Sequence, residues 1–117
     1  REIVPLAEPT LLVADRAPNA ATQDSLATAY ESRLAPAGRL HRNGRLPLQG
    51  REEAVAWLKT QAPVTGTECL YAETLIAGDL GYTWGSYDGG HYVRVWVRDA
   101  SGRWLVALDV TQPRRAS

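Results

Sequence analysis

Apolar residues follow a helical spacing in the first half of the chain. Leu26, Tyr30 and Leu34 recur at every fourth position, which places them on one stripe of a helix. Two further helices are predicted over residues 9–16 and 51–61. The first half is therefore expected to be mainly helical.

The ends of these helices are marked by residues that favour or break helical backbone. Thr22 can cap the second helix, and Asp24 then lies in its first turn, where a carboxylate suits the helix dipole. Pro18 is expected to end the first helix, and Pro36 with Gly38 the second, because neither residue type continues a helix readily.

The second half of the chain alternates with the period of a strand. Four β-rich runs are predicted, at residues 67–77, 80–87, 91–98 and 103–111. The breaks between them are short, so neighbouring runs must be antiparallel and form a meander. Upstream, Asn43 and Gly44 lie between two short alternating runs and predict a tight hairpin.

Helices followed by a meander indicate an α+β domain whose helices pack on one face of the sheet. The length suits one domain, residues 1–117, with a frayed tail at 112–117. Arg1 is not a translation start, so the chain is expected to be a processed product or a piece of a longer protein.

Charge and cysteine content exclude several classes of partner. The 13 basic and 13 acidic residues cancel, whereas nucleic acid and anionic membranes attract a basic surface. No apolar run approaches membrane-spanning length, so a soluble protein is expected. Cys69 is the single cysteine and is expected to be a buried apolar thiol, and with two histidines the chain offers no expected metal site. Motifs for phosphate loops or activated nucleophiles are missing, so no cofactor is expected.

The strand-rich segments resemble a known family. Residues 78–87, 92–98 and 103–109 are similar to the closing three strands of a bacterial domain of unknown function, in the SnoaL-like branch of the nuclear-transport-factor-two superfamily. Residues 44–48, 50–54 and Trp57 resemble that family's hairpin and third helix. The resemblance covers residues 22–111, but the family's first helix is usually continuous, whereas Pro9 and Pro18 interrupt it here.

The resemblance implies the cone-shaped fold of ketosteroid isomerase. A curved antiparallel sheet, made of the four-strand meander and a short hairpin, would carry the N-terminal helices on its concave face and enclose a cavity. Family members use different pocket groups for different reactions, so the fold implies no single activity. A location in the bacterial cytoplasm or periplasm is expected, without a choice between them.

Tight hairpins fix which side chains share a face of the sheet. One predicted face carries Tyr71, Glu73, Tyr82, Trp84, Ser86, His91, Val93, Val95, Val97, Trp104, Val106 and Leu108. The other carries Thr83, Gly85, Tyr87, Tyr92, Arg94, Trp96, Leu105, Ala107 and Asp109. The first face is richer in large apolar groups, so it is predicted to lie under the helices and line the cavity.

The polar and aromatic groups of the first face form the predicted site. The expected ligand-binding residues are Tyr71, Glu73, Tyr82, Trp84, Ser86 and His91. A carboxylate against Trp84 would have a raised pKa, which makes Glu73 a candidate acid or base and Tyr82 a candidate oxyanion donor. The simpler interpretation is a solvated Glu73 at a strand end, a structural Tyr82 and Ser86, and a loop histidine at 91.

The second face combines a charged cluster with aromatic side chains. Tyr92, Arg94 and Asp109 could bind a carboxylate, although a cross-strand salt bridge on the outer face is the simpler interpretation. Tyr87, Tyr92 and Trp96 would leave this face unusually aromatic, which predicts a homodimer through it.

Three functions are consistent with these features. The leading hypothesis is a domain that binds a small apolar ligand in a mostly apolar pocket, without established catalysis. The alternatives are a cofactor-free isomerase or lyase that uses a pocket carboxylate and a tyrosine, and a structural dimerisation module of a larger protein.

Overall fold

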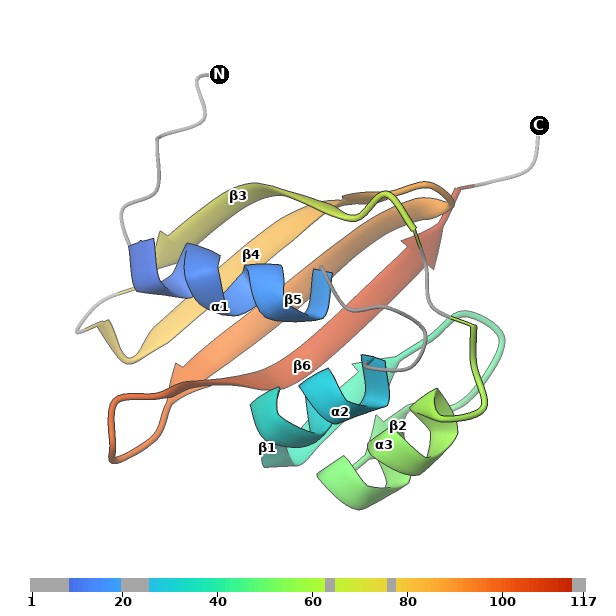
Figure 1. Cartoon of the computed structure of the whole chain (residues 1–117), viewed down its shortest axis with the longest axis horizontal. Helices are drawn as coiled ribbons and strands as arrows, with labels where there is room; N and C mark the ends of the chain where they lie inside the picture. Colours follow the sequence, from blue (N-terminus) through green and yellow to red (C-terminus); the bar gives the residue numbers. More distant parts are fainter. Residues whose placement is uncertain (1–8, 20–25, 63–64, 76–77, 115–117) are drawn as a thin grey trace.

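The computed structural model describes residues 9–19, 26–62, 65–75 and 78–114, which form three helices and a six-stranded sheet (Figure 1). The helices are α1 (Pro9–Asn19), α2 (Leu26–Arg33) and α3 (Arg51–Leu58). The strands are β1 (Leu34–His41), β2 (Leu48–Gln49), β3 (Glu68–Thr74), β4 (Leu80–Tyr87), β5 (Gly90–Arg98) and β6 (Trp104–Pro113). All three helices lie on one face of the sheet, which we call the helix-covered face; the opposite one is the outer face.

The predicted meander is confirmed, and so is the α+β class. Strands β3, β4, β5 and β6 pair in sequence with antiparallel neighbours. The sheet order is β2-β1-β6-β5-β4-β3, and β1 runs parallel to β6. The sheet is therefore mixed, whereas an antiparallel sheet was predicted.

The helix boundaries differ from the prediction at several ends. Helix α2 ends at Arg33, and Leu34 is already a sheet residue opposite Val106. Pro36 and Gly38 thus belong to strand β1, which pairs with β6, and do not form a helix end. Helix α1 runs through Pro18, and α3 is shorter than predicted. The predicted cap Thr22 and its neighbour Asp24 lie outside the described residues.

Two smaller predictions about connections and ends are wrong. Leu40 pairs with Leu48, so the Asn43–Gly44 turn lies inside a longer loop and does not form a two-residue hairpin. Gly44 has a φ of 84°, a backbone angle that glycine adopts without strain. Strand β6 continues to Pro113, so residues 112 and 113 pair with β5, whereas residues 115–117 lie outside the described part.

The predicted grouping of β4 and β5 side chains is confirmed, but the predicted choice of the face under the helices is wrong. The helix-covered face carries the buried residues Thr83, Tyr87, Tyr92, Arg94, Trp96, Trp104, Val106 and Asp109. The outer face carries Glu73, Tyr82, Trp84, Ser86, His91 and Val93, whose side chains are half-buried or exposed, together with the buried Tyr71. The homodimer contact predicted through Tyr87, Tyr92 and Trp96 is therefore corrected, because helices already cover these side chains.

A β-bulge explains part of this error. The register between β5 and β6 shifts between Val95 and Trp96, so Trp96 pairs with Val106 while Val95 pairs with Leu108. Beyond such a bulge, alternate residues change faces. Trp104 consequently shares the helix-covered face with Trp96 and is 3% exposed, so its predicted burial between the sheet and the helices is confirmed.

Glycines on β4 explain why the helices choose this face. A Cβ atom at Gly81 would lie 2.8 Å from Cδ2 of Leu11 on α1. A Cβ atom at Gly85 would collide with the backbone oxygen of Glu68 on β3 and would lie 2.8 Å from the ring of Tyr92. Side chains at these positions would hold α1 and Tyr92 away from the sheet, so the glycines permit their close packing.

The hydrophobic core fills the space between the helices and the sheet. Its fully buried members come from both layers: Leu11, Leu34, Leu40, Ala54, Trp96 and Val106. Within the described residues, no helix is long and apolar enough to cross a membrane.

Candidate functional site

Four of the six predicted ligand-binding residues lie together on the outer face. The Tyr82 hydroxyl donates to Oε1 of Glu73 at 2.9 Å, and the Tyr71 hydroxyl donates to the same oxygen. The Tyr71 ring lies 6.1 Å from that of Trp84, centroid to centroid, in a stacked arrangement. The sequence thus placed these four residues on a common face, but on the wrong side of the sheet and with Glu73 against Trp84, whereas Glu73 pairs with Tyr82 and Tyr71 pairs with Trp84.

The remaining two predicted residues lie apart from that cluster. Ser86 and His91 face each other across β4 and β5, close to the turn that joins these strands. His91 is exposed, and Ser86 is half-buried. Ligand binding by any of the six residues, and catalysis by Glu73 or Tyr82, stay predictions.

The hydrogen bond with Glu73 controls the protonation of Tyr82. This bond raises the pKa of Tyr82 to about 12, because ionisation of Tyr82 would break the hydrogen bond and leave a phenolate beside a carboxylate. Tyr82 therefore acts as a neutral hydrogen-bond donor at physiological pH.

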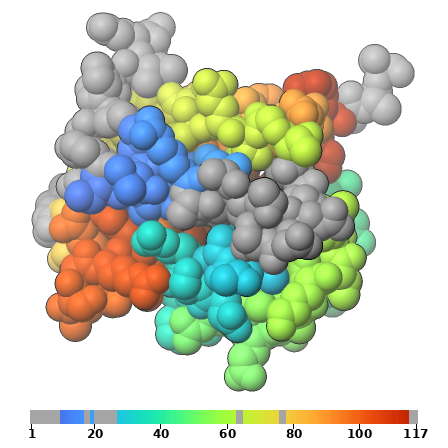
Figure 2. Space-filling model, viewed as in Figure 1, coloured from blue at the N-terminus to red at the C-terminus, as the bar shows by residue number. Residues whose placement is uncertain are grey.

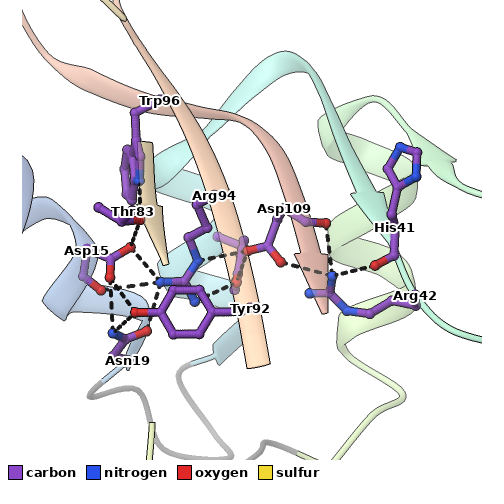
Figure 3. Close-up of polar contacts among 10 residues, drawn as sticks. Asp15, Asn19, His41, Arg42, Thr83, Tyr92, Arg94, Trp96 and Asp109 are labelled. Atoms are coloured by element: carbon purple, nitrogen blue, oxygen red, sulfur yellow. Dashed lines mark hydrogen bonds and ion pairs between the residues drawn. The ribbon is translucent and has the colours of Figure 1, made fainter. Parts of the chain in front are cut away.

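A second polar cluster is buried between the helices and the sheet, with Arg94 at its centre (Figure 3). Arg94 projects from β5, is 5% exposed and forms ion pairs with two carboxylates. Its Nη1 atom lies 2.8 Å from Oδ1 of Asp15, and its Nε atom 2.9 Å from Oδ2 of Asp109. The predicted contact between Arg94 and Asp109 is confirmed, but it lies inside the molecule, where an outer-face salt bridge was predicted.

Asp15 brings helix α1 into this cluster. Its carboxylate is fully buried and accepts hydrogen bonds from Thr83 at 2.7 Å and from Tyr92 at 2.6 Å, in addition to the pair with Arg94. Asn19, one turn later on the helix, donates to the Tyr92 hydroxyl and accepts from Arg94. Both oxygens of Asp15 are therefore engaged.

Asp109 brings together β6, helix α2 and the loop after β1. The Tyr30 hydroxyl donates to Oδ2 of Asp109, and Arg42 lies 2.9 Å from Oδ1. The latter contact is an ion pair without hydrogen-bond alignment. Arg42 also donates to the backbone carbonyl of Asp109 at 3.1 Å. Two carboxylates and two guanidinium groups thus balance in charge.

Burial and charge fix the protonation states of this cluster. Burial alone would raise the pKa of Asp109, but Arg42 and Arg94 outweigh it, and the pKa lies below its ordinary value. Burial also raises the pKa of Tyr30 to about 12 and that of Tyr92 well above its usual range. The tyrosines remain neutral donors, and Asp109 remains an anion.

A groove borders the cluster between α1 and the start of β3. It has a volume of about 360 Å³ and is lined by Leu12, Arg16, Asn19, Thr67, Glu68 and Cys69. Figures 1 and 2 show α1 lying along β3 on the helix-covered side. Asn19 belongs both to the groove and to the buried cluster, so it connects the two.

Cys69 lies at the inner wall of this groove. Its thiol lies against Asp15 and Tyr92, and it is half-buried, where a buried apolar thiol was predicted. Burial raises the pKa of this thiol to about 11, and the charge of Asp15 adds to the effect. Cys69 is therefore a neutral thiol and a weak nucleophile.

Sequence reasoning missed four members of the buried cluster, which are Asp15, Asn19, Tyr30 and Arg42. Each reaches the sheet from a helix or loop far away in sequence; Asp15 and Arg94 are 79 residues apart. One available signal was the pair of glycines at 81 and 85, which marks the face of β4 that a helix can approach. Among the described residues, no group of three or more His, Cys, Asp or Glu side chains could hold a metal ion.

Comparison with known proteins supports the fold. No family model matches the sequence, and no curated protein matches it. A ketosteroid isomerase-like protein from Erwinia carotovora atroseptica superposes with a TM-score of 0.82 at 14% identity, over 95% of this chain and 100% of that one.

Two further solved structures give the same result. An NTF2-like protein with a cystatin-like fold from Novosphingobium aromaticivorans has a TM-score of 0.70 at 12% identity, over 92% of this chain and 82% of that one. A conserved protein from Planctomyces limnophilus has a TM-score of 0.66 at 21% identity, over 92% of this chain and 97% of that one. The chain therefore has the fold of the ketosteroid isomerase-like and nuclear-transport-factor-two-like proteins.

Proposed function

We propose that this domain binds a small molecule in the groove between α1 and β3. The observation that carries the proposal is the position of Asn19, which forms part of the groove wall and is hydrogen-bonded into the buried cluster. A ligand in the groove would therefore contact side chains that are already held in place. Fixed polar groups in a concave site are typical of ligand-binding pockets.

The lining of the groove suggests a ligand with several polar atoms. Leu12 and Cys69 supply apolar surface, whereas Arg16 and Glu68 supply opposite charges and Thr67 a hydroxyl. A volume of about 360 Å³ lies at the small end of known ligand pockets, which span roughly 300–1,000 Å³. We therefore favour a small polar ligand over the mainly apolar one that the sequence suggested.

The protonation states favour binding over acid–base catalysis at this site. A general acid or base works best with a pKa near the working pH. The shifts in the cluster go the other way: the pKa of Asp109 is lowered, and those of Tyr30 and Cys69 are raised to about 12 and about 11. Cys69, which lines the groove, and Tyr30 and Asp109 in the neighbouring buried cluster therefore keep fixed protonation states, which suits ligand binding better than proton transfer.

A screen of small polar compounds tests the groove. Carboxylates, amides, sugars and alcohols would be added to the ¹⁵N-labelled protein, and amide shifts in α1 and β3 recorded. Leu12→Trp fills the groove, so compounds that bind the wild type should lose most of their effect. Val13→Trp is the matched control, because Val13 is the next residue and is 60% exposed. Compounds that bind all three proteins equally well, or no binding in the panel, would contradict the proposal.

A second function, homodimer formation, is favoured by the outer face of the sheet. Its three central cross-strand pairs are all apolar, namely Val93 with Val110, Val95 with Leu108 and Val97 with Leu105. Trp84 and Tyr82 extend this surface onto β4, and Val93 is 42% exposed. A continuous apolar sheet face is costly to leave in water, and a second copy can cover it by two-fold symmetry. This retains the predicted homodimer but moves its contact to the opposite face.

A further inference from the structure

Three side chains of the sheet converge on the carboxylate of Asp15. Thr83 on β4 donates to Oδ1, Arg94 on β5 donates to the same oxygen at 2.8 Å, and Tyr92 on β5 donates to Oδ2. Both oxygens of one carboxylate are thus recognised by groups from two neighbouring strands (Figure 3). Charge-assisted hydrogen bonds of this kind are among the strongest in proteins.

Contacts within the sheet hold Thr83 and Arg94 in place, and Asn19 on α1 adds hydrogen bonds to Tyr92 and Arg94. The Trp96 indole donates to the Thr83 hydroxyl at 2.9 Å, which directs the Thr83 proton toward Asp15. Asp109 fixes the Nε side of Arg94, and the Arg94 guanidinium carbon lies 4.4 Å from the centre of the Tyr92 ring. The recognition site is therefore preorganised mainly by residues of the sheet.

We propose that Thr83, Tyr92 and Arg94 form a binding site for a small carboxylate, that Asp15 fills this site as an internal ligand, and that a free carboxylate competes with Asp15 for it. The site goes beyond the groove of the proposed function and does not depend on it. Asn19 and Cys69 lie beside Asp15 at the groove wall, so a carboxylate in the groove would be close to the site. Exchange of the Asp15 carboxylate would remove the charged attachment of α1 to Arg94 and leave the hydrogen bonds of Asn19 and Thr10 to the sheet.

The first test removes the internal ligand. Asp15→Ala would be titrated with sodium acetate and sodium propionate, against sodium chloride at equal ionic strength, with thermal unfolding as the readout. We expect a saturable rise in Tm with the carboxylates and none with chloride. Asp15→Ala combined with Tyr92→Phe keeps the ring but removes one donor, and should bind acetate about tenfold or more weakly. A Tm of Asp15→Ala that responds equally to acetate and chloride would overturn the proposal.

The second test uses the intact protein. If Asp15→Ala does not fold in chloride, folding in acetate alone would support the site. If it folds in neither salt, the wild type decides. Amide hydrogen exchange in residues 9–19 should become faster in concentrated acetate than in chloride, while exchange in β5 stays unchanged. Equal exchange rates in the two salts would overturn the proposal.

Discussion

Arg94 shows how a single residue can depend on partners from several elements. Its guanidinium is nearly inaccessible to water, and it contacts Asp15 on α1, Tyr30 on α2 and Asp109 on β6. Burial alone would lower the pKa of Arg94, but the charges of Asp109 and Asp15 oppose this effect, and the pKa lies well above its ordinary value. The buried charges therefore stabilise the fold only as a complete set.

Asp109→Asn is expected to destabilise the protein in a pH-dependent way. The substitution leaves Arg42 and Arg94 without one counter-charge, which should cost about 3–5 kcal/mol in the free energy of unfolding at neutral pH. Because the pKa of Asp109 is lowered in the fold, its contribution is present above about pH 4 and disappears as the pH falls further. Urea unfolding from pH 7 to pH 2 should show the two proteins converging in stability.

Asp79→Asn is the matched control for this experiment, since Asp79 is exposed. It should change the free energy of unfolding by less than about 0.5 kcal/mol. A difference between wild type and Asp109→Asn that stays constant down to pH 2 would show that the carboxylate charge is not what stabilises the cluster.

Some of this cluster could be predicted at the residue scale, and some could not. Arg94 and Asp109 are close along a hairpin, so their contact follows from strand pairing. Asp15 and Tyr30 meet Arg94 only after α1 and α2 have packed on the sheet, and no local pattern encodes that meeting. The protonation states also depend on burial, which a sequence does not give directly.

At the scale of elements, the packing of α1 depends on the small residues of β4. Gly81 and Gly85 flank Thr83 on the helix-covered face, and this leaves room for the helix and for Tyr92. Glycine lowers the intrinsic preference of a strand for β-structure, so these two positions serve the packing of α1 and Tyr92 and not the stability of the isolated strand.

Gly81→Val is expected to push α1 away from the sheet. The added Cβ would approach Leu11 at 2.8 Å and the backbone oxygen of Glu73 at 2.9 Å, and the backbone cannot yield easily. We expect a loss of about 1–3 kcal/mol in the free energy of unfolding. Hydrogen exchange in residues 9–19 should accelerate.

Ser86→Val is the control for this prediction, because it adds a similar side chain to the outer face of the same strand. It should leave hydrogen exchange in α1 at the wild-type rate. Equal acceleration in both variants would mean that bulk anywhere on β4 disturbs the helix, and that the contact at Gly81 is not specific.

Strand positions were predictable from the alternation of side chains, but the faces were not. The runs at 80–87 and 91–98 match β4 and β5 closely, because the turn residues between them are unmistakable. The bulge opposite Val95 and Trp96 depends on the curvature of the complete sheet, so the local sequence does not predict it. Apolar content then misled the choice of face, because the outer face carries Val93, Val95, Val97 and Trp84 beside its polar groups.

At the scale of the whole molecule, one face of the sheet is covered by helices and the other is not. The three helices account for the burial of Thr83, Arg94 and Trp96, whereas Val93 and Leu80 on the outer face are 42% and 38% exposed. The general architecture followed from the order of helices and strands in the sequence, because helices before a meander have few ways to pack.

Val93→Glu is expected to abolish the homodimer that we propose through the outer face. A buried carboxylate without a partner would disfavour the contact, while the monomer should fold normally because Val93 is already partly exposed. Sedimentation at micromolar concentration should give a dimer for the wild type and a monomer for the variant.

Leu46→Glu is the control for the assembly experiment. Leu46 is 82% exposed but lies in the loop between β1 and β2, away from the outer face. This variant should remain a dimer. A wild type that stays monomeric at high concentration, or a Val93→Glu variant that still dimerises, would exclude the outer face as the contact.

The parallel pairing of β1 with β6 has a consequence for synthesis on the ribosome. β6 is the last strand of the described chain, yet it lies between β1 and β5. Until it leaves the exit tunnel, β1 has only the two-residue β2 as a neighbour, and the three strands of the unfinished meander have no connection to it. The nascent chain therefore exposes two separate sheet fragments until β6 pairs with both of them. Unpaired strand edges are prone to aggregation, so we expect slow folding and a benefit from chaperones during synthesis.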